Sequence, residues 1–208
     1  MPSKGRRYGD ATPSLDDIVT AALALLDEGG RPGLTIARLA ARLDSYPANL
    51  YRRFTDMDEL LGHVAARIFE EIGGGPDPDA DPVAALLDFA LRCRDGWLAH
   101  PRAISLLFHG HQEALAEPLE AYVTVFRRIA TSDARLVAAI YEYTTLVYGA
   151  IFLGAAPGWG YDPAPARPES YPNTAFVLGL AGQPDRAVPA GEPFRAAVTR
   201  AIRLAIDG

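Results

Sequence analysis

Apolar residues recur with the period of an α-helix near the start of the chain, in the stretch "SLDDIVTAALALLDEGG". One stripe of the expected helix consists of Ile18, Ala22, Leu25 and Leu26. Ser14 precedes this stripe, and Asp17 comes three residues after Ser14, which is the spacing of a capping box at a helix N-terminus. Gly29 and Gly30 are residues typical of a helix end. The pattern predicts a first amphipathic helix between Ser14 and Gly29.

Two shorter helical patterns follow. Thr35 can cap a helix whose apolar positions have the spacing i, i+3, i+4 and i+7. These positions are Ile36, Leu39, Ala40 and Leu43. The period breaks after Asp44 and restarts near Pro47, with Leu50 and Phe54 four residues apart. Two short helices joined by a few residues predict a helix-turn-helix.

Polar and basic side chains lie between the apolar positions of this helix-turn-helix. The third helix can lie in a DNA major groove, where Asn49 and Arg52 suit base edges. Thr35 and Tyr51 suit phosphate oxygens, and the basic arm before the first helix can reach a minor groove. The predicted DNA-binding residues are Lys4, Arg6, Arg7, Thr35, Tyr46, Pro47, Ala48, Asn49, Tyr51, Arg52 and Arg53. The alternative is an ordinary three-helix packing unit with solvated arginines.

Charge and composition limit the choice of class. The net charge of −6 looks wrong for a nucleic-acid binder, but residues 1–56 carry eight basic and seven acidic residues, so the acidic excess lies in the remainder. With 49% hydrophobic residues, the chain is expected to be a globular protein rather than a disordered one. Its one cysteine excludes an intramolecular disulfide, and no apolar segment follows the basic N-terminus as in a signal peptide. We therefore expect a cytoplasmic protein.

The stretch "LTIARLAARLDSYPANLYRRFTDMDELL", residues 34–61, resembles the signature of the tetracycline-repressor (TetR) family of bacterial transcription regulators. That family has a short apolar helix, a tight turn, an "LYxxF" recognition helix and an acidic-capped fourth helix in this order. The C-terminal part, "YPNTAFVLGLAGQPDRAVPAGEPFRAAVTRAIRLAIDG", is similar to the ending of the tetracycline-repressor-like subgroup, in which a long loop precedes the last dimerisation helix. The resemblance implies an operator-binding regulator with a helical ligand-binding domain.

Four positions depart from the family pattern. Asp44 stands where the family usually has Gly, and Ser45 stands where a buried Val is usual. Asp tolerates a left-handed turn, but Ser fills less of the core. Tyr46 replaces a capping Ser or Thr and can place a phenol against DNA, and Met57 replaces a Lys that often contacts phosphate. These changes leave the fold intact but make the operator sequence hard to guess.

The rest of the chain also has helical patterns, at about 83–100, 102–112, 116–131, 133–155 and 192–206, so we predict an all-α fold. The predicted domains are a DNA-binding domain at 1–57 and a larger ligand-binding and dimerisation domain at 58–208. A long loop at 157–193 is rich in turn formers, and its apolar run "TAFVLGLA" suggests one docked helical turn. The loop either covers the domain or has no role.

Segment 134–156 is apolar nearly all round and long enough to cross a bilayer. Glu142, Thr144, Thr145 and Gly149 in its middle argue against a membrane. A soluble helix of this kind must be covered on every side. We expect one face to meet its own domain and the other a twin subunit, with the last helix completing a four-helix contact in a homodimer.

The sequence contains no G-x-S-x-G motif, Walker loop, H-E-x-x-H motif or dinucleotide-binding fingerprint. We predict no enzyme, cofactor or metal site. Aromatic residues on the later helices, with a few polar neighbours, can line a largely apolar ligand pocket or form a solid core. The candidate ligand-binding residues are Trp97, His100, Phe108, His111, Gln112, Tyr122, Phe126, Tyr141, Tyr148 and Phe152.

Three functions remain possible at this point. The leading one is a homodimeric repressor that binds an inverted-repeat operator in double-stranded DNA and is released by an unidentified small molecule. The second is a DNA-binding regulator without a small-molecule inducer, which a solid core would favour. The third is a helical small-molecule-binding protein whose DNA binding is vestigial.

Overall fold

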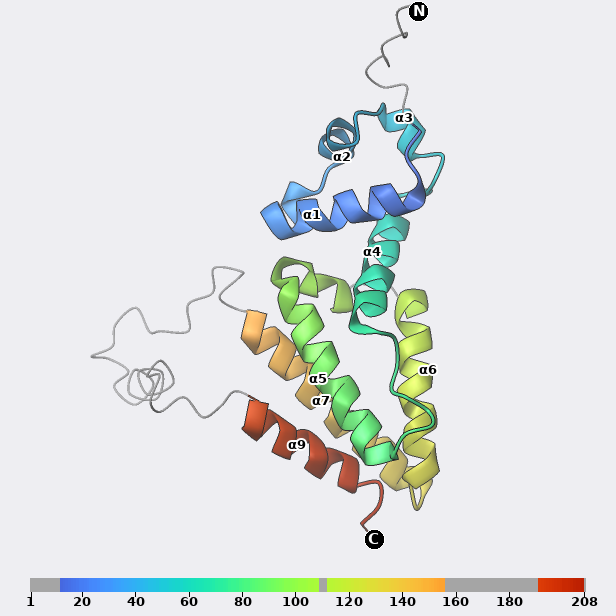
Figure 1. Ribbon diagram of the computed structural model, residues 1–208, viewed down its shortest axis with the longest axis vertical. Coiled ribbons are helices and arrows are strands. Elements are labelled where there is room, and N and C mark those ends of the chain that lie inside the picture. The colour runs from blue at the N-terminus through green and yellow to red at the C-terminus, as the bar shows by residue number, and fades with distance from the viewer. Residues whose placement is uncertain (1–11, 109–111, 156–190, 208) are drawn as a thin grey trace, which may run out of the picture. The chain divides into compact units, whose positions relative to one another are not determined.

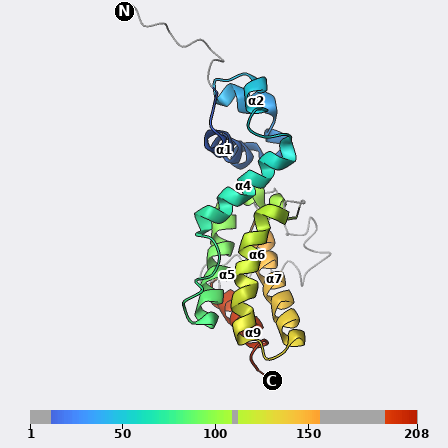
Figure 2. The ribbon, with the colours of Figure 1, turned by 90° about the vertical axis from the view of Figure 1, so that its right-hand side faces the viewer.

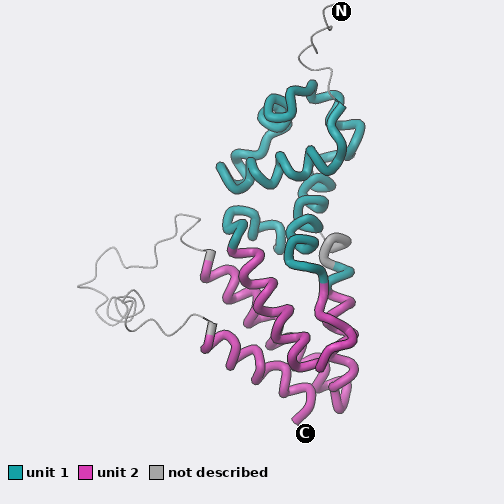
Figure 3. The backbone as a smooth tube through the Cα atoms, viewed as in Figure 1, with its two compact units in different colours: residues 1–74, 99–118 teal, residues 75–98, 119–208 magenta. Residues whose placement is uncertain are grey.

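The computed structural model describes residues 12–108, 112–155 and 191–207, and every regular element in these ranges is a helix (Figure 1). The predicted all-α fold is therefore confirmed for this part of the chain. The chain forms two compact units (Figure 3). The first unit consists of Met1–Gly74 and Ala99–Pro118, and the second of Gly75–Leu98 and Leu119–Gly208. The basic arm and the predicted docked turn of the long loop lie outside the described residues.

The first unit begins with α1, Leu15–Gly33, whose capping box is present as predicted. The Ser14 hydroxyl accepts from the Asp17 N–H, and the Asp17 carboxylate accepts from the Ser14 N–H. The Ser14 hydroxyl also donates to the Asp17 carboxylate at 2.6 Å, and this bond first, then the one from the Ser14 N–H, holds the pKa of Asp17 below its ordinary value. Gly30, with φ 62° and ψ −167°, leaves the helical conformation, so the predicted helix end lies where the regular helix stops.

The helix-turn-helix consists of α2, Ile36–Arg42, and the four-residue α3, Pro47–Leu50. Between them Asp44 has φ 48°, a left-handed conformation that an Asp side chain tolerates better than most. The Ser45 N–H donates to the Ala40 carbonyl at 3.0 Å, and Ser45 is only 2% exposed. The turn therefore closes with Asp and Ser in place of the Gly and Val of the family pattern.

α4, Met57–Ile72, follows, with Asp56 as its N-cap and Gly73 in the left-handed conformation at its end. α1 packs against α2 and α4, and α2 packs against α3. The core between these helices is apolar and fully buried, and its largest side chains are Ile18, Leu26, Leu34, Leu39, Leu50, Leu60 and Ile68. This core holds the short α3 in place, because four residues cannot form a stable helix alone.

The helix predicted at about 102–112 is a 3-10 helix, η1, over Pro101–Phe108. Buried residues recur every three positions, as Ala103 with Leu106 and Ile104 with Leu107. Three residues per turn is the period of a 3-10 helix, which places such pairs on one face. η1 packs with this face on α1 and α4 and completes the core of the first unit.

The second unit contains α5, Pro82–Ala99, most of α6, Gln112–Ile129, then α7, Asp133–Ala155, and α9, Gly191–Arg203. These helices lie alongside one another (Figure 2). α7 and α9 are in extensive contact. The Thr131 N–H also donates to the Ala205 carbonyl at 3.0 Å, which fixes the end of the chain beside the start of α7. The predicted helix boundaries agree within a few residues.

Candidate DNA-binding surface

The helix-turn-helix presents several predicted DNA-binding residues on its surface. Thr35 is the N-cap of α2, and its hydroxyl accepts from the Arg38 N–H at 3.3 Å. Pro47 and Ala48 at the start of α3 are exposed, and so is Arg52 just after it. Thr35 is also exposed, and it lies at the N-terminus of α2, where backbone N–H groups favour an anion. The local structure thus keeps this set accessible to DNA.

Two tyrosines flank α3. Tyr46 is its N-cap without a side-chain capping bond, and its side chain is 54% exposed. Tyr51 is 52% exposed and its ring lies 5.7 Å from that of Phe54, which is buried. Asn49 is half-buried, and its amide nitrogen lies 3.4 Å from the Ser45 hydroxyl. The two phenols are therefore the large side chains that α3 offers to a partner.

Three arginines near this surface make contacts within the fold. Arg38 donates to the Gly33 carbonyl at 2.7 Å, and Arg42 donates to the Glu28 carboxylate at 2.6 Å. Arg53 is exposed, but its Nε donates to the Pro13 carbonyl at 3.2 Å. Arg53 thus ties the segment before α1 to the end of α3. No local pattern predicts this bond, because the two residues are forty positions apart.

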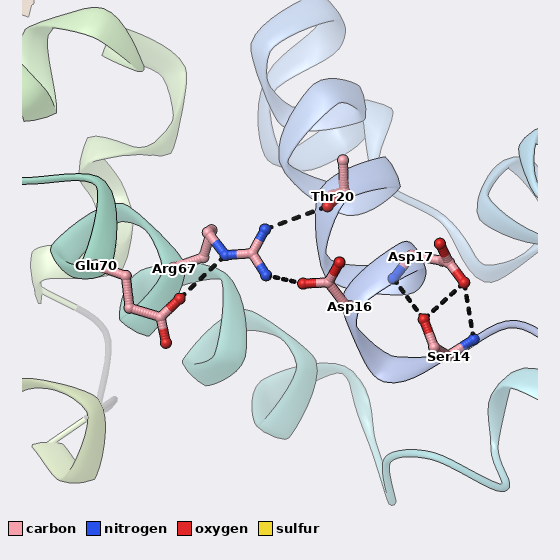
Figure 4. A network of polar contacts seen from close by, with 6 residues as sticks. All are labelled: Ser14, Asp16, Asp17, Thr20, Arg67 and Glu70. Atoms are coloured by element: carbon pink, nitrogen blue, oxygen red, sulfur yellow. Dashed lines mark hydrogen bonds and ion pairs between the residues drawn. The ribbon is translucent and has the colours of Figure 1, made fainter.

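A polar network joins α1 to α4 (Figure 4). Arg67 of α4 pairs with Asp16 and with Glu70, and it donates to the Thr20 hydroxyl at 3.3 Å. The bond to Asp16 is the largest cause that raises the pKa of Arg67. α1 packs on α2 of the helix-turn-helix and on α4. The contacts of Arg67 therefore help to hold the helix on which α2 packs.

The candidate ligand-binding residues are not all in one place. Trp97 and Phe126 are fully buried in the second unit, whereas Tyr141 and Phe152 are 72% and 46% exposed. His100 belongs to the first unit, where it lies between two carboxylates. The side chains of Phe108 and Gln112, and all of His111, lie outside the described residues. The role of these ten residues in ligand binding stays a prediction.

Four aromatic rings pack together in the second unit. The Tyr122 ring lies 5.6 Å from that of Tyr143 and 6.3 Å from that of Phe126, and Phe89 completes the group. The Tyr143 hydroxyl donates to the Leu86 carbonyl at 2.8 Å. Burial is the main cause that raises the pKa of Tyr122 and, far more, that of Tyr143. Tyr143 was not among the residues predicted from the sequence, although its four-residue spacing from the buried Ala139 and Val147 is a signal for it.

Among the described residues no three His, Cys, Asp or Glu side chains are arranged to hold a metal ion. α7 is long and apolar enough to cross a membrane by length and composition, and 22% of its most apolar window is buried. Its outer face carries the exposed Val137, Tyr141 and Leu153. A soluble protein must cover such a face.

Comparison with known proteins identifies the first unit. Residues 18–64, from α1 into α4, match the family model of bacterial regulatory proteins of the tetR family. The structure of the transcriptional regulator SCO7222, a TetR from Streptomyces coelicolor, aligns over 94% of this chain and all of that chain, with a TM-score of 0.71 and 27% identity. The helix-turn-helix segment of this chain matches the TetR family. The match to SCO7222 extends the TetR architecture, with its helical second domain, over both units.

Two further known proteins are similar to this chain. The transcriptional repressor DrrR1 of Streptomyces coeruleorubidus is 28% identical over 155 residues, which cover 72% of this chain and 55% of DrrR1. The chain thus spans little more than half the length of this curated relative. The structure of BioQ with its double-stranded DNA operator aligns over 82% of this chain and 99% of that chain, with a TM-score of 0.60 and 27% identity. DrrR1 is thus described as a transcriptional repressor, and BioQ is described with a DNA operator.

Proposed function

We propose that this TetR-family regulator is a homodimeric repressor that binds an inverted-repeat operator and leaves it when a small molecule binds. The observation that carries the DNA-binding part is the exposed face around α3, where Tyr46, Tyr51 and Arg52 stand clear of the core. DrrR1 is a repressor and BioQ has been solved with its operator, which supports the same role here. We place this activity in the cytoplasm.

The DNA contacts divide into two kinds under this proposal. Asn49 and Arg52 read base edges in the major groove, and Thr35 and Tyr51 hold phosphates. The basic arm contributes Lys4, Arg6 and Arg7 in a minor groove. The remaining contacts come from Tyr46, Pro47, Ala48 and Arg53. Residues 1–57 form the DNA-binding domain in this scheme, and residues 58–208 form the domain that senses the ligand and dimerises.

The dimer rests on the outer face of α7. Val137 is 67% exposed, Tyr141 72% and Leu153 70%, although the helix has an otherwise buried inner face. A second copy of the chain supplies the missing cover through an isologous contact of α7 and α9 with their symmetry mates. A dimer also presents two recognition helices, as a palindromic operator requires.

The residues that bind the small molecule are proposed to lie in the second unit. Tyr122 and Tyr148 are half-buried aromatic residues with hydroxyl groups, so they combine apolar surface with a polar group as small-molecule sites do. The tight ring packing of Phe126 on Tyr143, at 5.3 Å and 82°, favours the other candidate, a regulator whose second domain has a solid core and no small-molecule inducer. A thermal-shift screen of the purified protein against varied small molecules separates the two, because a ligand of the folded state raises the apparent stability.

Selection from random-sequence DNA tests the DNA-binding part. We expect the purified chain to enrich a palindrome, with log affinity that falls linearly with log salt concentration. Tyr51→Phe and Thr35→Ala should weaken binding to all sequences alike, whereas Asn49→Ala or Arg52→Ala should change the preferred sequence. Enrichment of no palindrome by the folded wild-type protein would refute the proposal. Equal losses on every site for all four variants would refute the division of contacts.

A further inference from the structure

Two basic side chains at the start of η1 hold the last regular turn of α1. His100 lies with Nδ1 2.8 Å from Asp27 Oδ2 and with Nε2 3.1 Å from Glu71 Oε2 of α4. Arg102 donates from Nη1 to the carbonyl of Asp27 at 2.9 Å and also to the carbonyl of Glu28. A cation at a helix C-terminus is favourable because the helix dipole places partial negative charge there. We refer to His100 and Arg102 with these partners as the η1 clamp.

The same turn of α1 also holds the helix-turn-helix. The Glu28 carboxylate accepts from Arg42 of α2 at 2.6 Å and lies 3.9 Å from Arg38. Arg38 continues to the Gly33 carbonyl, just before α2 begins. Asp27 and Glu28 therefore stand between two sets of bonds, one to η1 and one to the first helix of the helix-turn-helix. This turn of α1 therefore joins η1 to α2 through side-chain contacts.

The Asp27 side chain depends on the clamp for its hydrogen bonding. Its Oδ1 is buried and has no hydrogen-bond partner among the described residues. The contact of Oδ2 with His100 therefore offsets the cost of burying this carboxylate. A buried carboxylate oxygen that loses its compensation is costly. His100 thus contacts the carboxylates of Asp27 and Glu71, one through each ring nitrogen, and Arg102 binds the backbone carbonyls of the same turn of α1.

The position of the clamp along the chain gives it a role in orientation. The chain enters the first unit between Leu98 and Ala99, directly before His100, and the other two passages lie at Gly74–Gly75 and Pro118–Leu119. The connection at Gly74–Gly75 follows Gly73 and includes Gly74, both with positive φ, and glycine constrains the backbone little. The connection at Leu98–Ala99, in contrast, is followed within four residues by His100 and Arg102, which bind α1.

We propose that His100 and Arg102 are positioning residues that hold the helix-turn-helix at the spacing of the operator half-sites, by fixing α1 and through Glu28 also α2. This role rests on the proposed function, because it requires a dimer on a palindromic operator. The clamp touches no DNA in this proposal. It affects how much the affinity of the dimer falls when the spacing between the half-sites changes. The contacts with bases are unchanged.

Half-site spacing gives a readout that a role in stability alone does not move. The operator is first obtained by selection with the wild-type protein. Duplexes are then prepared with the same half-sites and a centre one or two base pairs shorter or longer, and fluorescence anisotropy gives Kd for the full-length wild type and for Arg102→Met. Arg102→Lys tests rescue, since an ammonium can still donate to both carbonyls. Arg128→Met is the matched control, because Arg128 also donates to a backbone carbonyl, that of Pro78, but in the second unit.

We expect the wild type, Arg102→Lys and Arg128→Met to discriminate strongly against altered spacing. Arg102→Met should lose about five- to a hundredfold of this discrimination, the range typical of a coupling between sites. Its affinity for a single half-site should stay the same. His100→Asn should behave like Arg102→Met, and it serves as the test if Arg102→Met does not fold. A folded clamp variant with the wild-type spacing preference would overturn the inference, whereas a wild type that binds no palindrome would overturn the proposed function instead.

Discussion

The outer face of α7 allows a sharp test of the dimer, because neighbouring positions of one helix differ completely in burial. Val137 is 67% exposed and Tyr141 is 72% exposed in the single chain, whereas Val147 is 3% exposed in its core. A glutamate at Val137 or Tyr141 meets water in the monomer and costs its folding little. The same glutamate at Val147 places a charge in the core and should unfold the chain.

The magnitude at the interface follows from the cost of an unpaired charge. If a second copy covers Val137 and Tyr141, each glutamate becomes buried without a partner when the dimer forms. An uncompensated buried charge costs about 3–5 kcal/mol, and each 1.4 kcal/mol is tenfold in Kd. A C2 contact contains each substitution twice, so Val137→Glu should weaken dimerisation by at least about a hundredfold.

Sedimentation velocity over a range of concentrations, with circular dichroism on the same samples, separates the outcomes. We expect wild-type dimers, folded monomers of Val137→Glu and Tyr141→Glu, and unfolded or aggregated Val147→Glu. Val137→Thr is the matched control, since it keeps the shape of the side chain without a charge and should remain dimeric. Folded Val137→Glu and Tyr141→Glu proteins that dimerise with the wild-type Kd would refute the assignment of this face to a second copy.

Two predictions concern the core of the second unit. Burial raises the pKa of Cys93 from 9.0 to about 12, so the folded state resists ionisation that the unfolded state undergoes, and its stability should fall by up to about 1.4 kcal/mol per pH unit above pH 9. Cys93→Ala should remove this loss between pH 9 and 10 in urea titrations, and an unchanged slope would contradict the assignment. Tyr143→Phe removes the bond to the Leu86 carbonyl at 2.8 Å and should lower the free energy of unfolding by about 0.5–1.5 kcal/mol at pH 7. A variant as stable as the wild type would show that this bond contributes nothing.

Local signals in the sequence were enough to predict much of the first unit. The capping box of Ser14 and Asp17 needs only residues three apart, and the left-handed Asp44 needs only a turn that a helix-turn-helix must make. The helix-turn-helix and the resemblance to the TetR family follow from a pattern confined to residues 34–61. Such features are determined within one or two helical turns, so a sequence displays them directly.

Features that depend on distant partners could not be predicted in this way. The apolar pattern of η1 fits both a 3-10 helix and an α-helix, and its packing on α1 and α4 decides between them. His100 looked like a polar group for a ligand, but Asp27 and Glu71, 73 and 29 residues away in sequence, engage both its nitrogens. The bond from Arg53 to Pro13 is of the same kind. These contacts are tertiary, and no spacing within a single helix reports them.

The first unit is built from two stretches of the chain that are not consecutive, with η1 added after α5 has intervened. During synthesis, α1 to α4 therefore emerge before the segment that supplies Ile104 and Leu107 to their core. A hybrid regulator that contains only residues 1–74 of this chain would have a DNA-binding part with an uncovered apolar surface, and its α1 would lack the contacts of His100 and Arg102. We expect operator specificity to be transferred between such regulators only when residues 99–108 are transferred together with the helix-turn-helix, or when the recipient has an equivalent segment.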